Sequence, residues 1–229
     1  MAFEPQFKYR NLPDQLADHI VELFAKGDLE PGQRLYEKDV CELLGVSRVP
    51  VREAFRILGA QGVVRTEPNR GSFLAELGPD EMSEMLEIRL TVERIALRRL
   101  LKLVASKPEL LEELTGAIDN MRRASRIDDQ LTYCRADLAF HSKVVELSES
   151  PLLKPIWDSL SRVVLVLLMK ERNVNFDYDA AIRDHEVLVE LIRDRKRSAL
   201  DKEIERHITN TRDKRLGRAS LAAEEDIGT

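Results

Sequence analysis

The scarcity of strand-like sequence limits this chain's fold more than any other feature. Across 229 residues we find one convincing strand pattern, a hairpin at residues 63–75 with its turn at 68–71. Elsewhere, apolar residues recur with the spacing of amphipathic helices. The sequence therefore predicts a mainly α-helical protein that a single small hairpin interrupts.

The expected helices fall into two groups, separated at Gly78-Pro79. Before this point we expect helices at residues 12–27 and 37–44, and a third helix that begins after Ser47. After it we expect six helices, near residues 80–104, 109–125, 128–147, 152–172, 178–194 and 197–216. The expected domains are thus an N-terminal domain at 1–77, an all-helical domain at 78–216 and a flexible tail at 217–229.

Composition favours an intracellular protein without a membrane anchor. No apolar stretch approaches the roughly 20 residues that span a bilayer, and the N-terminus lacks the regions of a signal peptide. Cys41 and Cys134 lie in unrelated segments, which fits a reduced, cytoplasmic environment. The net charge of −5 argues mildly against a nucleic-acid binder, but the distribution of charge decides more than its sum.

Residues 46–70 carry a local excess of positive charge, with five arginines against two glutamates. Arg48, Arg52 and Arg56 repeat every four residues along the third expected helix, beside an apolar side made by Val51, Ala54, Phe55 and Leu58. Two helices, a short turn, a third helix and a hairpin together predict a winged helix-turn-helix. Such a module places the N-terminus of its third helix in the major groove of DNA.

The residue types in this region suit contacts with DNA. The planar fork of arginine can bond O6 and N7 of guanine together. Ser47 and the backbone at the helix start suit a phosphate, and Arg70-Gly71 at the hairpin tip could reach the minor groove. The alternative is that the arginines form an ordinary solvated face of the helix.

The motifs of this region resemble the GntR family of bacterial transcription regulators. The resemblance covers nearly all of residues 12–76 and rests on Pro31-Gly32-Gln33-Arg34-Leu35, on the string GVSRVPVREA at 45–54 and on Gly71-Ser72-Phe73. Lys38 stands where the family usually has arginine, which keeps the charge but loses the bidentate fork. The predicted DNA-binding residues are Arg34, Lys38, Ser47, Arg48, Arg52, Arg70 and Gly71.

A second set of residues, in the expected helical domain, has the chemistry of a metal site. Asp137 and His141 are four residues apart and share a helix face, and His185 and His207 lie on the apolar sides of two later helices. A buried aspartate is costly unless it is paired or coordinates a metal. Imidazole and carboxylate ligands suit zinc, our first expectation, or nickel or another divalent ion. His19 lies far from this set in the sequence.

The same residues resemble the FCD domain, the all-helical ligand-binding domain of the FadR subgroup. The resemblance covers roughly 80–216 and implies that Asp137, His141, His185 and His207 hold a metal. It also implies a small carboxylate effector, such as an organic or sugar acid, bound beside the metal. Arg89 is the candidate anchor for that acid, and the alternative is a surface salt bridge with Glu93 at i+4.

We therefore expect a homodimeric, DNA-binding transcription regulator and not an enzyme. It would act as a repressor on a two-fold symmetric operator, and a carboxylate bound at the metal would control its affinity. One alternative is a repressor for which the metal ion itself is the signal; another is a metal-free regulator that binds acyl chains. A metal-dependent hydrolase is disfavoured, because no glutamate between Asp137 and His141 could serve as a base.

Overall fold

The computed structural model describes residues 12–127, 129–171 and 176–215. The chain divides into two compact units, at residues 1–76 and 77–229, called here the N-terminal unit and the helical unit. The predicted tail at 217–229 lies outside the described residues. Over the described ranges, the only strands lie in the N-terminal unit, so the predicted fold class is confirmed.

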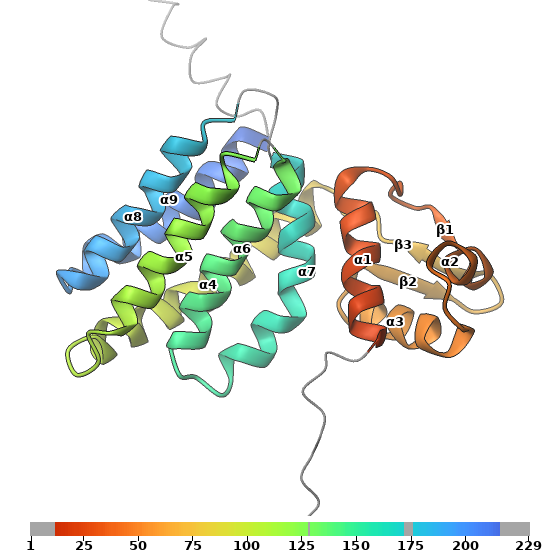
Figure 1. Ribbon diagram of the computed structural model, residues 1–229, viewed down its shortest axis with the longest axis horizontal. Helices are drawn as coiled ribbons and strands as arrows, with labels where there is room; N and C mark the ends of the chain where they lie inside the picture. Colours follow the sequence, from red (N-terminus) through yellow and green to blue (C-terminus); the bar gives the residue numbers. More distant parts are fainter. Residues whose placement is uncertain (1–11, 128, 172–175, 216–229) are drawn as a thin grey trace, which may run out of the picture. The chain divides into compact units, whose positions relative to one another are not determined.

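Within its described residues, 12–76, the N-terminal unit contains three helices and a three-stranded antiparallel sheet (Figure 1). The helices are α1 (Leu12–Lys26), α2 (Glu37–Leu44) and α3 (Arg48–Ala60). The strands are β1 (Arg34–Leu35), β2 (Val64–Glu67) and β3 (Gly71–Leu74), in the order β1-β3-β2. Helix α1 packs against α3, and α3 packs against α2 and β2. This is the arrangement of a winged helix-turn-helix.

The apolar side of α3 forms the centre of this unit. Val51, Ala54, Phe55 and Leu58 are all buried, as their spacing predicts. Before α3, Gly45 ends α2 in the left-handed conformation (φ 64°), which glycine adopts at little cost. This turn sends the chain directly into α3, so that its N-terminal arginines stay on the surface.

Strand β1 is the one element that the sequence analysis did not predict. Its two residues, Arg34 and Leu35, pair with Phe73 and Ser72 of β3. A two-residue strand has no alternation to detect in the sequence. It forms because the edge of the predicted hairpin offers unpaired backbone groups to a neighbouring segment.

The helical unit has six helices within the described ranges, and each begins and ends within two residues of its prediction. They are α4 (Pro79–Leu103), α5 (Leu110–Ala124), α6 (Gln130–Leu147), α7 (Leu153–Glu171), α8 (Tyr178–Arg193) and α9 (Arg197–Arg215). None of the described helices is long and apolar enough to cross a membrane.

Helix α4 packs against four helices that follow later in the sequence: α6, α7, α8 and α9. Its buried residues include Arg89 and Glu93 among aliphatic side chains. Arginine and glutamate are seldom fully buried unless they are paired. Arg89 and Glu93 are paired with each other. This pair lies beside the candidate metal centre.

Candidate metal centre and DNA-binding surface

Three helices bring the three predicted histidines together in the interior of the helical unit. His141 comes from α6, His185 from α8 and His207 from α9. The Nε2 atom of His141 lies 3.2 Å from Nε2 of His185 and 3.4 Å from Nε2 of His207. One ligand atom from each ring falls within 4.8 Å of the others, so the cluster could hold a metal ion.

Asp137 adds a carboxylate to the same cluster. Its Oδ1 atom lies 3.4 Å from Nε2 of His141 and 3.9 Å from Nε2 of His185. Asp137, His141 and His185 are buried, and His207 is half-buried. The structure thus brings together all four residues that the sequence analysis predicted. His19 is exposed on α1 of the N-terminal unit and is not among them.

The ring charges of the three histidines differ because their surroundings differ. Burial lowers the pKa of His185 from 6.5 to about 4, against the opposing charge of Asp137. Burial also lowers the pKa of His207 well below its usual value. Burial opposes charge on His141 as well, but the charge of Glu93 and the hydrogen bonds with Asp137 and Glu93 together raise the pKa of that ring. His185 and His207 are therefore neutral at pH 7, the form that binds metals.

Glu93 and Arg89 form a buried ion pair next to His141. Oε2 of Glu93 lies 2.5 Å from Nδ1 of His141, and Nε of Arg89 donates to Oε1 of Glu93 at 2.6 Å. Burial would raise the pKa of Glu93, but the charges of His141 and Arg89 outweigh it and lower that pKa to about 2. The i,i+4 pair with Glu93 therefore exists, but it lies in the interior and not on the surface, where the alternative placed it.

The donor set fits a divalent metal ion in composition and placement. Three imidazoles and one carboxylate are the ligands that zinc and similar ions bind in proteins. The four residues come from α6, α8 and α9, so an ion held by them would connect three helices. Sequence spacing revealed Asp137 and His141 directly, whereas the contact of Glu93 with His141 crosses from α4 to α6 and has no local signal.

The predicted DNA-binding residues lie on the N-terminal unit, at the start of α3, on α2 and around the hairpin tip. Arg48 is the first residue of α3 and Arg52 lies one turn further; both are exposed. Within the part of the chain that the structure describes, Arg48 forms no salt bridge, whereas Arg52 pairs with Glu37 at 2.8 Å. Ser47 occupies the N-cap position of α3 but makes no side-chain capping hydrogen bond, so its hydroxyl stays available for another acceptor or donor.

Three of the other predicted residues, Arg34, Arg70 and Gly71, lie near the tip of the hairpin. The guanidinium of Arg34 lies over the ring of Tyr36, 4.7 Å from its centroid. A Cβ atom at Gly71 would meet the same guanidinium at 3.2 Å, and the φ of 103° at Gly71 also favours glycine. Arg70 is exposed and pairs with Glu67 at 2.6 Å. Arg34, Arg70 and Gly71 thus lie together, while the exposed Lys38 stands on α2.

Two strongly exposed apolar residues of the N-terminal unit were not predicted from the sequence. Val49 in α3 has 77% of its surface exposed, and Leu43 in α2 has 69%. The signal was present for Val49, because at 100° per residue it points opposite Val51, the centre of the apolar side. An exposed aliphatic group beside Arg48 suits contact with a thymine methyl group.

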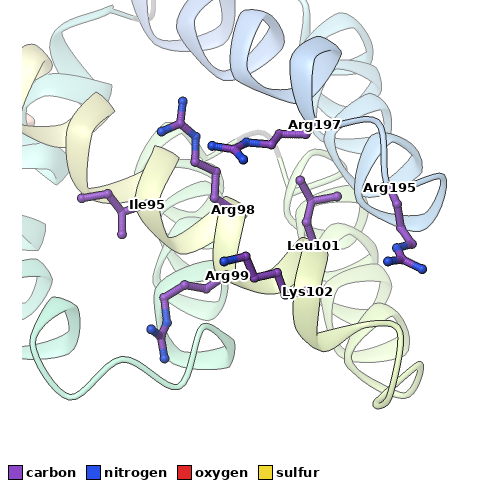
Figure 2. Close-up of a pocket in the computed structure, with 7 residues that line it drawn as sticks. All are labelled: Ile95, Arg98, Arg99, Leu101, Lys102, Arg195 and Arg197. Carbon is purple, nitrogen blue, oxygen red and sulfur yellow. The ribbon is translucent and has the colours of Figure 1, made fainter.

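The helical unit also carries a basic pocket, with a cavity of about 410 Å³, between α4 and the turn that joins α8 to α9. It is lined by Ile95, Arg98, Arg99, Leu101, Lys102, Arg195 and Arg197. Figure 2 shows the side chain of Arg197 extending toward Arg98, and that of Arg99 pointing away from both. Arg98 donates to both carboxylate oxygens of Asp201, and Arg99 to the carbonyl of Ser148. Two of the five cations therefore hold neighbouring helices in place.

Comparison with known proteins identifies both units. Residues 12–74 match the family described as "Bacterial regulatory proteins, gntR family", and residues 84–210 match the "FCD domain". A protein of Paenarthrobacter nicotinovorans, named "Probable D-xylose utilization operon transcriptional repressor", is 31% identical over 78% of this chain and 77% of its own length. This chain belongs to the GntR family of bacterial regulatory proteins.

This GntR-family regulator is also similar to other regulators over most of its length. The gluconate operon transcriptional repressor of Bacillus subtilis (strain 168) is 24% identical over 82% of this chain and 78% of its own length. Among solved structures, E. coli McbR/YncC has a TM-score of 0.74 at 20% identity, covering 95% of this chain and 100% of that one. A GntR-type transcriptional regulator from Rhodococcus sp. RHA1 has a TM-score of 0.72 at 22% identity, covering 90% and 97%.

These findings confirm the predicted family, fold class and general function. The relatives are transcription regulators, which also confirms the prediction that this GntR-family protein is not an enzyme. The assignment of individual residues to DNA, metal and effector stays a prediction that follows from the geometry above.

Proposed function

We propose that this GntR-family regulator is a homodimeric repressor whose affinity for its operator depends on a small carboxylate bound at a metal in the helical unit. The observation that carries the proposal is the cluster of His141, His185, His207 and Asp137 within the interior. In the proposed organisation, residues 1–77 bind DNA, and residues 78–216 bind the effector and the metal. Its site of action is the cytoplasm, where the operator DNA is.

The proposed DNA contacts divide between base reading and positioning. Arg48 and Arg52 at the start of α3 would reach base edges. The hydroxyl of Ser47 would donate a hydrogen bond to a phosphate. Arg34, Arg70 and Gly71 would contact the DNA backbone or the minor groove. Lys38 would add positive charge near the DNA. Two copies related by a two-fold axis would require an operator of the same symmetry.

The proposed metal ligands are Asp137, His141, His185 and His207, and zinc is the ion that this set favours, with nickel or another divalent ion as alternatives. A bound divalent ion supplies positive charge that an anion could neutralise in a low-dielectric interior. Arg89 lies one turn before Glu93 on α4 and is the proposed second anchor for the acid. One relative is named for the gluconate operon, and gluconate is a sugar acid, so sugar acids are the first candidates.

A metal-sensing repressor is the second candidate, and one contact favours it. The Nε atom of Arg89 is already engaged by Glu93, so this arginine supports the fold whether or not an acid binds. In that case the ion alone would be the signal. The two candidates differ in what a chelator does and in whether an acid has any effect.

The test measures affinity for an operator selected from random duplex DNA, at one fixed salt concentration. We expect at least one organic or sugar acid to change the affinity of the metal-loaded protein by 5-fold or more, within the usual range of allosteric coupling of roughly 5- to 150-fold. The same acid should have no effect after chelation. If chelation alone changes the affinity and no acid does, the metal-sensing candidate replaces this one.

A further inference from the structure

We infer that Glu93 is a positioning residue, which fixes the ring of His141 so that Nε2, and not Nδ1, is the nitrogen that faces the metal. This inference rests on the metal site of the proposed function and assigns a role to a residue outside the ligand set. Glu93 lies on α4, whereas the ligands lie on α6, α8 and α9. Helix α4 therefore takes part in the site without supplying a ligand.

The geometry at His141 gives each ring nitrogen a different partner. Nδ1 lies 2.5 Å from Oε2 of Glu93, and Nε2 faces His185, His207 and Asp137 at 3.2 to 3.4 Å. An ionised carboxylate only accepts hydrogen bonds, so Nδ1 must carry the hydrogen. In the neutral ring, Nε2 is then the atom left to donate its lone pair to an ion. Metal-binding histidines in general donate their other N–H group in this way.

Arg89 fixes the orientation of Glu93 in turn. Its guanidinium only donates, and its Nε atom holds Oε1 of Glu93 at 2.6 Å, which leaves Oε2 for His141. Both side chains of this pair are buried, so neither carboxylate oxygen can exchange its partner for bulk water. Hydrogen bonds from Arg89 to Glu93 and from His141 to Glu93 therefore link α4 to the metal site and fix which atoms donate and which accept.

Glutamate differs from glutamine at this position in a way that can be tested. In a Glu93→Gln variant, the amide oxygen is required by Nε of Arg89, so the amide NH2 group faces Nδ1 of His141. Because that group donates, Nδ1 must accept, and the ring hydrogen moves to Nε2, where it blocks the metal. The side chain keeps its size, so the packing of α4 is retained.

The experiment measures zinc affinity by competition with a chelator at pH 8, for the full chain. Glu93→Gln should lower the affinity by about 10- to 100-fold, the usual effect of removing such a partner. Glu84→Gln, an exposed substitution on the same helix, should leave it unchanged. Equal affinities for Glu93→Gln and the wild type would overturn the inference, whereas a wild type that binds no zinc refutes the proposed function itself.

A double variant separates positioning from a general loss of packing. Arg89→Met combined with Glu93→Gln removes the donor that holds the amide oxygen, so the amide can turn and accept from Nδ1 of His141. We expect this double variant to bind zinc more tightly than Glu93→Gln alone. If the second substitution only adds to the damage, Glu93 acts through packing and the inference fails.

A measurement on the wild type needs no variant to fold. In the zinc-loaded protein, the 15N chemical shifts of the ring of His141 should show a protonated Nδ1 and a metal-bound Nε2. The chain has only four histidines, so few ring signals have to be assigned. Zinc bound through Nδ1 of His141 would overturn the inference.

Discussion

Arg52 in the N-terminal unit and Arg89 in the helical unit each form a salt bridge with a glutamate, at 2.8 and 2.6 Å, but their surroundings are opposite. The side chains of Arg52 and Glu37 are 65% and 35% exposed, whereas those of Arg89 and Glu93 are 2% and 1% exposed. An exposed pair contributes at most about 1 kcal/mol, because water and salt compete with it. Breaking a buried pair by removing one partner costs about 3–5 kcal/mol, because the remaining charge is buried without a partner and without hydration by water.

This difference assigns different tasks to similar residues. Arg52 can leave Glu37 for a phosphate or a base at little cost, which suits a residue that must change partners when DNA binds. Arg89 and Glu93 keep their partners and hold His141 in one orientation. Exchangeable charges thus mark the DNA-binding surface, and fixed charges mark the candidate metal centre.

The largest expected effect is on metal content. The purified wild type should carry close to one divalent ion per chain, and His185→Ala should lose most of it, because one imidazole ligand is removed from a buried set. His19→Ala is the matched control, since His19 is exposed on the other unit. Metal analysis by mass spectrometry decides the matter, and equal retention by both variants would refute the site.

The second effect is on the pH dependence of stability of the metal-free protein. The pKa of His185 falls from 6.5 in the unfolded chain to about 4 in the folded one, and that of His207 also falls. Between pH 6.5 and 4 the unfolded chain binds more protons at these rings, so stability decreases as the pH is lowered. The raised pKa of His141 opposes this trend, but the pKa values of two rings, His185 and His207, are lowered and that of only one is raised.

Unfolding can be followed in the helical unit alone, because Trp157 of α7 is the single tryptophan of the chain and is buried. Each unit of pKa difference is worth about 1.4 kcal/mol, so the loss at pH 4 should reach roughly 2–3 kcal/mol. His185→Leu should reduce this pH dependence. If the variant keeps the full dependence, burial of His185 is not its cause.

The third effect tests the exposed charges. Arg52→Ala should weaken operator binding by about 1–3 kcal/mol if this arginine reads a base, and Arg48→Ala should have a comparable effect. Arg56→Ala should cost less, because Arg56 lies further from the start of α3 and pairs with Glu53. Gel-shift assays at one salt concentration compare them. Wild-type binding by the Arg48→Ala/Arg52→Ala double variant would exclude α3 as the recognition helix.

The smallest effect concerns the starts of two helices. Asp177 caps α8 by accepting a hydrogen bond from the backbone of Ala180 at 2.8 Å, whereas Ser47 makes no such bond at the start of α3. Asp177→Ala should therefore cost about 1 kcal/mol of stability in chemical unfolding. Ser47→Ala should cost less stability but weaken DNA binding. A reversed order of stability losses would contradict these roles.

The two units also differ in how far the sequence predicted them. The string at residues 45–54 places Gly45, Arg48 and Arg52 by local geometry, and together with the predicted hairpin it indicated the winged helix-turn-helix. The metal residues were found because each has helical neighbours that define an apolar side. Strand β1 and the contact between Glu93 and His141 were not predicted, because each joins segments that are distant in sequence.

Arg89 shows where sequence reasoning reaches its limit. The i,i+4 spacing to Glu93 predicted a salt bridge, and the structure contains one. Spacing on one helix could not show that α4 is surrounded by α6, α7, α8 and α9, which removes water from the pair. The partner was therefore predictable, but the burial that determines its energetic weight was not.

The central claim is that a carboxylate bound in the helical unit and an operator bound by the N-terminal unit affect each other. Calorimetry of the acid with the metal-loaded protein, in the absence and presence of saturating operator DNA, tests this claim most directly. Linkage requires that the operator change the affinity for the acid by the same factor by which the acid changes the affinity for the operator. We predict equal factors of at least 5. An acid that binds at the metal with the same affinity whether or not operator DNA is bound would contradict the account.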